Sequence, residues 1–150
     1  MNMRIPLFLI ISATSLLIAG CSAPDGEPTE FAKACDSANE KKYIEVSGYL
    51  ADRGSVFCSN TGVRMECGFD LLESPSSDKK LRVDIEQGSG ANTVDELQRG
   101  YKKEDIKIRD NSGNLITFSN KVKLDGKMSI APAAGSAQGV CFMQVSKIER

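Results

Sequence analysis

The chain has 150 residues, of which 41% are hydrophobic, and it carries a net charge of −1 at pH 7 with no His and no Trp. A nearly neutral chain lacks the basic excess that is typical of nucleic-acid-binding proteins. The absence of His removes the commonest general base and the commonest neutral metal ligand together.

Residues 1–20 have the composition of a secretory signal peptide. Arg4 supplies the positive charge, residues 5–18 are mainly apolar, and Ala19 and Gly20 are the small residues that precede a cleavage site. The apolar run is too short for a comfortable membrane span. We therefore expect this segment to direct export and then to be removed. The 130 residues that remain suit one domain with a single core.

The junction Ile18, Ala19, Gly20 and Cys21 resembles the lipobox of bacterial lipoproteins. The resemblance implies cleavage before Cys21, diacylation of its sulfur and acylation of its new amino group. Ser22 at the next position resembles lipoproteins that are sorted to the outer membrane, with the domain facing the periplasm. The inner membrane and the cell surface remain alternatives, as does an ordinary signal peptide with a chance cysteine nearby.

Residues 21–30 follow as the acylated cysteine and a polar tether. Pro24, Gly26, Pro28 and three acidic residues form a composition that buries little apolar surface and favours a flexible, extended segment. Fully extended, this tether reaches at most about 30 Å. A single domain then occupies residues 31–150.

The domain is expected to begin with a short helix over residues 31–39, and strands follow. Alternation of apolar and polar residues with period two predicts half-buried strands over residues 43–50, 63–71 and 81–86. The third is the clearest, because leucine, valine and isoleucine at alternate positions point to one face and charged residues to the other.

A helical period follows the third strand. Thr93 and Glu96 are spaced as a capping box, and Val94, Leu97 and Tyr101 fall at positions i, i+3 and i+7. The pattern predicts one helix inserted between strands.

Strand patterns then resume and continue to the end of the chain. A hairpin is expected over residues 106–118, with its turn at 110–113. The next strand is expected over residues 122–128, followed by a loop of small residues at 129–139 and a last strand over 140–148.

This order of elements is similar to that of an OB-fold barrel, in which a small sheet with one apolar face removes its edges by closing. Residues 46–50, 122–127 and 141–148 resemble the glycine-bent first strand, the fourth strand and the fifth strand of OB-fold domains in bacterial periplasmic and lipid-anchored proteins. The resemblance predicts a mainly β fold, a small OB-fold-like barrel with one inserted helix and a short N-terminal helix. The hairpin at 106–118 exceeds the five strands of that family. An immunoglobulin-like sandwich, the main rival, would have more strands before any helix.

The cysteines predict two disulfides, because four remain in an exported chain once Cys21 is assigned to lipid. Cys35, Cys58, Cys67 and Cys141 permit three pairings, and spacing alone does not choose among them. We favour Cys58 with Cys67, since a turn-like run between them brings two strand arms within disulfide distance, and Cys35 with Cys141. No C-x-x-C pair and no His supports a zinc site, so neither a metal nor a cofactor is expected.

The OB-fold resemblance implies binding on the second and third strands and on the loops at 51–62 and 129–139. The candidate binding residues lie on the polar strand face and in the second loop: Arg64, Glu66, Arg82, Ala133, Ala134 and Ser136.

No nucleophile, base and orienting group stand together in a recognisable motif, so we expect a non-enzymatic function. Staphylococcal-nuclease-like enzymes also use an OB barrel, but their arginine and carboxylate pattern is not found. The leading hypothesis is a membrane-anchored periplasmic lipoprotein that binds an envelope protein or a small ligand, with neither nucleic acid nor metal. The alternative is an inhibitor or immunity protein against a secreted or periplasmic enzyme, acting through residues 129–139.

Overall fold

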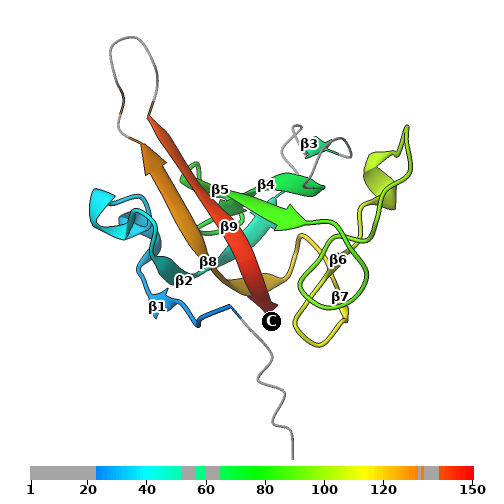
Figure 1. Ribbon diagram of the computed structural model, residues 1–150, viewed down its shortest axis with the longest axis horizontal. Coiled ribbons are helices and arrows are strands. Elements are labelled where there is room, and N and C mark those ends of the chain that lie inside the picture. The colour runs from blue at the N-terminus through cyan, green and yellow to red at the C-terminus, as the bar shows by residue number, and fades with distance from the viewer. Residues whose placement is uncertain (1–22, 52–56, 60–64, 132, 134–138) are drawn as a thin grey trace, which may run out of the picture.

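The computed structural model describes residues 23–51, 57–59, 65–131, 133 and 139–150. These residues form β-strands and three short 3-10 turns, and they contain no α-helix (Figure 1). The strands are β1 (Glu27–Pro28), β2 (Tyr43–Ala51), β3 (Phe57–Ser59), β4 (Glu66–Leu72), β5 (Lys80–Glu86), β6 (Ile108–Arg109), β7 (Leu115–Ile116), β8 (Lys121–Ala131) and β9 (Val140–Glu149). The 3-10 turns are η1 (Phe31–Lys33), η2 (Ser37–Asn39) and η3 (Lys103–Asp105).

Five of the strands close into a barrel. β2, β4 and β5 form an antiparallel meander, β5 pairs in parallel with β9, and β8 lies between β9 and β2. Closure removes the unpaired edges that an open sheet of these five strands would expose. The mainly β barrel predicted from the sequence is therefore confirmed, but without the helices that were expected to accompany it.

The barrel closes at β2, which pairs with β8 over residues 43–49 and with β4 over residues 49–51. Gly48 lies where β2 passes from one neighbour to the other. A Cβ atom at this position would lie 2.5 Å from the carbonyl oxygen of Leu72 and 2.8 Å from Cγ of Leu71. The glycine therefore permits the close approach of β4.

The inner face of the barrel holds the core, and it follows the alternation that the sequence predicts. In β2 and β5 every second residue is buried. In β8 and β9 the buried residues include Met128 and Met143, which are fully buried. The largest fully buried side chains are Phe69, Ile44, Leu50, Leu71, Leu81, Ile85, Leu124, Met128, Met143 and Ile148.

The helix expected over residues 31–39 is replaced by the two turns η1 and η2. Asp36 between them has an extended backbone, with φ −64° and ψ 136°, which breaks the helical run. Ala34 is buried against the core and Cys35 is joined to Cys141, so tertiary contacts rather than helical periodicity fix this segment. Within the described residues no helix is long and apolar enough to span a membrane.

The inserted helix expected around Thr93 to Tyr101 is also wrong, because the segment runs extended beside the barrel. Val94 forms bridges with Gln87 and with Ile108, and it is fully buried. The residues expected in the first helical turn have other partners: the hydroxyl of Thr93, the predicted cap, donates to the carbonyls of Gly88 and Gly90, and Asp95 pairs with Arg109.

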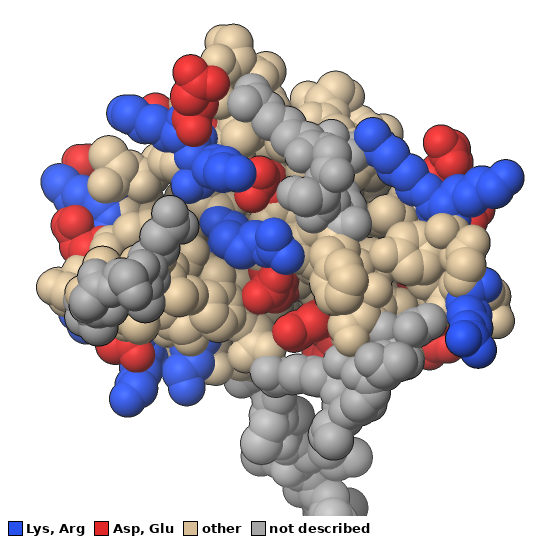
Figure 2. All heavy atoms as spheres, turned by 90° about the horizontal axis from the view of Figure 1, so that it is seen from above, with Lys and Arg blue, Asp and Glu red and all other residues tan. Residues whose placement is uncertain are grey.

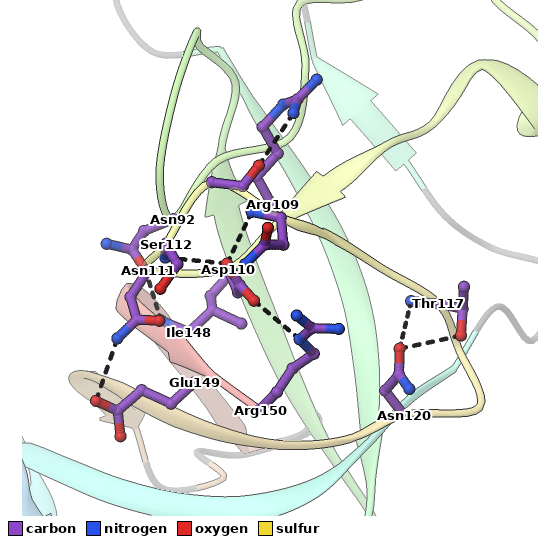
Figure 3. A network of polar contacts seen from close by, with 12 residues as sticks. Asn92, Arg109, Asp110, Asn111, Ser112, Thr117, Asn120, Ile148, Glu149 and Arg150 are labelled. Atoms are coloured by element: carbon purple, nitrogen blue, oxygen red, sulfur yellow. Dashed lines mark hydrogen bonds and ion pairs between the residues drawn. The ribbon is translucent and has the colours of Figure 1, made fainter.

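The hairpin predicted over residues 106–118 is present as β6 and β7, which form a separate two-stranded sheet. Asp110 organises its turn by accepting hydrogen bonds from the backbone N–H groups of Ser112 and Asn114, both at 2.9 Å. The same carboxylate accepts a hydrogen bond from Nε of Arg150 at 2.9 Å, which fastens the hairpin to the end of the chain (Figure 3).

The loops are shorter than the sequence predicts. The strand β8 continues to Ala131, which pairs with Val140, so the expected loop at 129–139 loses its first three residues to the β8–β9 hairpin. In the loop at 51–62, Phe57–Ser59 form the edge strand β3.

The N-terminal segment was expected to be a free tether, but from Gly26 onward it lies on the barrel. β1 pairs in parallel with residues 44 and 45 of β2, on the edge that β4 does not reach. Backbone hydrogen bonding along an open strand edge holds a segment that has little apolar surface to bury.

Two disulfides join Cys35 to Cys141 and Cys58 to Cys67, the pairing that the sequence favours. The first spans 106 residues and ties the segment between η1 and η2 to the start of β9, whereas the second spans nine residues and links the paired strands β3 and β4.

Removal of the long-range disulfide should destabilise the domain more than removal of the short one. In the chain-entropy model a loop of ~100 residues contributes about 4.7 kcal/mol, and a 15-residue loop about 3 kcal/mol. Urea unfolding of the double variants Cys35→Ala/Cys141→Ala and Cys58→Ala/Cys67→Ala tests this order. A larger loss for the second variant, with both retaining their far-ultraviolet circular dichroism, would contradict it.

Candidate functional site

Two of the predicted binding residues lie on neighbouring strands. Glu66 begins β4 and Arg82 lies in the middle of β5, and both side chains belong to the outer face of the barrel. Ala133 is exposed beyond the end of β8. Arg64, Ala134 and Ser136, like the proposed lipidation site Cys21, lie outside the described residues.

The strand register extends this outer face across β9 and β8. Asp84 is the cross-strand partner of both Gly68 and Gln144, and Gln144 is in turn the partner of Lys127. Lys127 pairs with Tyr43 on β2. We call the outward side chains of this region the polar face: Glu66, Arg82, Asp84, Glu86, Lys127 and Gln144.

Arg82 lies across the centre of the polar face. Its guanidinium covers Gly68, since a Cβ atom at Gly68 would collide with the terminal atoms of this side chain. Nε of Arg82 donates to Oδ1 of Asp84 at 3.4 Å. The arginine remains 41% exposed, so it is positioned by the protein and still open to a partner.

Asp84 is the most constrained charge of the face, with only 19% of its side chain exposed. Burial raises the pKa of this carboxyl above its usual value, and the charge and hydrogen bond of Arg82 oppose that rise. The unfavourable free energy of removing the carboxylate from water therefore exceeds the favourable free energy of its interaction with Arg82. Charged groups kept at such a cost are found at functional sites as well as in structural networks.

A hollow of about 340 Å³ opens beside the polar face, between β5, β9 and the segment at residues 91–93. It forms where β5 and β9 part, because their pairing ends at Asp84 and Gln144. Glu86 lies on one side, and Tyr43 and Lys127 on the other. The bottom is polar, with Ser146, whose hydroxyl donates to the carbonyl of Asp125 at 3.2 Å.

The side chains around the hollow keep unused hydrogen-bonding capacity. Within the described part of the chain, Glu86, Lys127 and Gln144 make no side-chain hydrogen bond or ion pair with other residues. Glu86 also faces Glu66 directly across β4 and β5. Like charges opposite each other destabilise a sheet, so a cationic group placed between them would be favourable.

The polar face carries both signs of charge, as does the wider surface around it. Figure 2 shows Lys and Arg interspersed with Asp and Glu on the side of the molecule that is seen from above. Among the described residues no group of three or more potential ligands is arranged to hold a metal ion. The arrangement is suited to binding a molecule that presents both positive and negative groups.

The sequence analysis missed several residues of this site. Phe57 is 68% exposed and lies next to Gly68 in the cross-strand register, and Lys127 and Gln144 come from strands that were considered only for their apolar residues. Alternation identifies Lys127 and Gln144 as outward positions, but it does not identify Phe57, which falls in the predicted loop at 51–62. Only the register of β9 against β5 and β8 shows that Lys127 and Gln144 lie in line with Asp84.

Comparison with known proteins assigns the chain to no family. No protein-family model matches it. No curated protein matches it at a significant level of similarity. The site is therefore interpreted from its own geometry.

Asp84→Asn should raise stability at neutral pH. Because the folded pKa of Asp84 lies above the unfolded value, the native state holds this proton longer, and stability falls as pH rises through that interval. The amide has no ionised form and removes this loss. The stability difference between variant and wild type, from urea unfolding between pH 3 and pH 7, should therefore grow in favour of the variant with rising pH. A constant difference would show that Arg82 cancels the effect of burial, and a reversed trend would show that Arg82 outweighs it; either result contradicts the prediction.

Proposed function

We propose that the protein is a lipid-anchored, non-enzymatic binding module of the bacterial cell envelope, and that it binds a partner protein through the polar face. The observation that carries this proposal is the set of outward polar side chains around the 340 Å³ hollow, Glu86, Lys127 and Gln144, that make no side-chain hydrogen bond or ion pair with any residue the structure describes. Arg82 is already held over Gly68 and against Asp84, so it loses less conformational freedom than a free side chain when a partner binds.

We further propose that the barrel belongs to the OB-fold class. Support comes from the strand order, in which a three-stranded meander is followed by two strands that return so that the last lies beside the third in parallel. OB barrels bind through the face of their second and third strands, which correspond here to β4 and β5. The hairpin β6–β7 would then be an insertion between the third and fourth barrel strands.

A protein partner suits this face better than a small apolar ligand does. The face joins an exposed aromatic ring, Phe57, to a positioned arginine and to carboxylates of different burial. Aromatic residues and arginine dominate the energetics of protein interfaces. A polypeptide surface also offers ammonium, carboxylate and amide groups, which can pair with Glu86, Lys127 and Gln144 respectively.

The proposed location rests on the sequence of residues 1–22. The signal-peptide composition and the lipobox-like junction at Cys21 favour lipid attachment, and Ser22 favours the outer membrane, with the domain in the periplasm. Two disulfides agree with an oxidising compartment, because cytosolic thiols are kept reduced.

A second function, as an inhibitor or immunity protein, is favoured by the β8–β9 hairpin. Figure 1 shows this hairpin extending past the barrel. At its base Ile130, Ala131 and Val140 line an apolar hollow of about 500 Å³ beside the Cys35–Cys141 disulfide. An inserted hairpin with an apolar base is a shape that can close the cleft of one enzyme.

Capture of the partner distinguishes the two surfaces. Arg82→Gln should lower recovery of the main protein crosslinked in intact cells by at least about tenfold, which corresponds to about 1.4 kcal/mol. Gly68→Val should act in the same direction, because its side chain displaces the Arg82 guanidinium. Lys33→Gln is the matched control, since it removes one exposed positive charge far from β5 in the chain.

The hairpin hypothesis gives the opposite pattern. Replacement of Ala133, Ala134 and Ser136 by Glu should then abolish capture, whereas Arg82→Gln leaves it unchanged. That result, in variants whose thermal midpoints match the wild type, would overturn binding through the polar face.

Cys21→Ser should release the domain from the membrane. Anchoring by two or more acyl chains is stable because each buried CH₂ contributes about 0.8 kcal/mol, and the variant has none. Membrane fractionation and mass spectrometry of the mature N-terminus measure this directly. An unmodified wild-type N-terminus at a residue other than Cys21 would disprove the lipid anchor, and fractionation with the inner membrane would disprove the outer-membrane location.

A further inference from the structure

We infer that residues 24–29 form a strap that holds the N-terminal anchor against one end of the barrel, so that this end faces the lipid headgroups and the β8–β9 hairpin points away from the membrane. The inference rests on the proposed lipidation of Cys21. It adds a defined orientation to what would otherwise be a domain on a loose tether.

The strap is held by backbone contacts along its length. Residues 27 and 28 pair in parallel with residues 44 and 45 of β2. Thr29 donates its N–H to the carbonyl of Glu45 at 2.9 Å, and Gly26 donates its N–H to Oδ1 of Asp125 at 2.7 Å.

Asp125 is built into the barrel in a way that requires the strap. It is 2% exposed, and its other oxygen, Oδ2, has no hydrogen-bond partner within the described residues. Without Gly26 the described residues would leave the buried carboxylate without a hydrogen bond, which is unfavourable. Gly26 fits because it has no side chain: a Cβ atom there would collide with the carbonyl group of Ile44 and lie 2.6 Å from the nitrogen of Glu45.

Ion pairs link the strands at the end of the barrel that the strap covers. Lys147 lies 3.6 Å from Asp25 and 2.8 Å from Glu149, and Glu149 also pairs with Lys123 at 2.7 Å. These two lysines lower the pKa of Glu149 to about 2, so the network stays ionised at neutral pH.

Neighbouring turns are joined to the same end of β9. Asn92 accepts the N–H of Ile148 at 2.8 Å, and Asn111 donates its backbone N–H to the carbonyl of Ile148 at 2.7 Å (Figure 3). Ala23, Pro24 and Asp25 line a shallow hollow together with Asn111 and Lys147. The strap therefore lies on a surface that several elements hold in place.

The position of the strap shortens the reach of the anchor. A free segment from Cys21 to Thr29 would span up to about 30 Å, whereas only two peptide units separate Cys21 from Ala23, which is at most about 7 Å. A lipid on Cys21 would therefore bring the barrel end around Asn111 and Lys147 to the level of the headgroups.

The opposite end of the molecule carries the β8–β9 hairpin. β9 runs from Val140 at the hairpin to Lys147 at the strap, and at about 3.3 Å per residue these positions are roughly 23 Å apart. The polar face lies along the side of the barrel between these ends, because Arg82 is beside Phe142 in the register. With the strap in place, the polar face would lie on the side of the barrel, turned neither toward the membrane nor away from it. A periplasmic protein can reach it there.

Energy transfer from a single tryptophan tests the orientation, since the chain contains no Trp of its own. The full-length acylated protein is reconstituted into phosphatidylcholine vesicles that contain a small fraction of phosphatidylethanolamine with a dansyl headgroup. Asn111→Trp places the donor at the strap end, and Val140→Trp places it at the hairpin. Both positions are exposed. Transfer should be at least twofold more efficient from position 111 than from position 140.

Two further variants separate the strap from the anchor. Gly26→Val should bring the two efficiencies together, because it displaces the strap while the protein still floats with the vesicles. Loss of the Gly26–Asp125 hydrogen bond should lower its thermal midpoint, so the comparison is made at a temperature where circular dichroism shows the variant to be folded. A spacer of eight Gly and Ser residues between Ala23 and Pro24 should lower both efficiencies, because the strap stays bound while the anchor moves away.

Equal transfer from the two positions, in protein that floats with the vesicles, would overturn the strap and leave the proposed lipid anchor standing. Protein that fails to float would overturn the lipid anchor, and with it the role of the strap. Unequal transfer that persists in Gly26→Val would show that another contact sets the orientation.

Discussion

The closure of the barrel at β2 is the constraint on which the rest of the structure depends. β2 pairs with β8 along most of its length and with β4 at its end, and it can do so because Gly48 lets the backbone of β4 come close. Once β2 is shared in this way, β9 must lie between β8 and β5 to complete the wall. The parallel pairing of β5 with β9 follows. The polar face and the hollow beside it exist because that parallel pairing ends after Gln144.

The strands were predictable because their physical cause is local. A half-buried strand needs an apolar residue at every second position, and β2, β5 and β8 satisfy this in any environment. The conformation around Thr93, where a helix was expected, does not have a local cause of this kind. Thr93 and Asp95 are compatible both with a helix N-terminus and with the contacts that they make with Gly88 and Arg109. The burial of Val94 in β-bridges favours the second arrangement.

The site was predictable only in part, for a related reason. Alternation places Glu66 and Arg82 on an outer face, but it does not show which outward residues of distant strands become neighbours. Lys127 and Gln144 reach the polar face through the register of β9, which depends on the closure of the whole barrel. The contact between Gly26 and Asp125 spans 99 residues and likewise leaves no pattern in the sequence. Composition indicated that residues 22–30 bury little apolar surface, and it could not indicate that an edge of β2 was open to residues 27 and 28.

The two disulfides are nested, since Cys58 and Cys67 both lie inside the loop closed by Cys35 and Cys141. Export from the N-terminus, as proposed above, would present Cys35, Cys58 and Cys67 to the oxidising compartment before Cys141 arrives. The correct partner of Cys35 is therefore the last to become available, and premature bonds to Cys58 or Cys67 must be reversed by thiol–disulfide exchange. Maturation of this protein should accordingly be limited by reshuffling, on a scale of seconds to hours, and should depend on how well the cell catalyses that exchange.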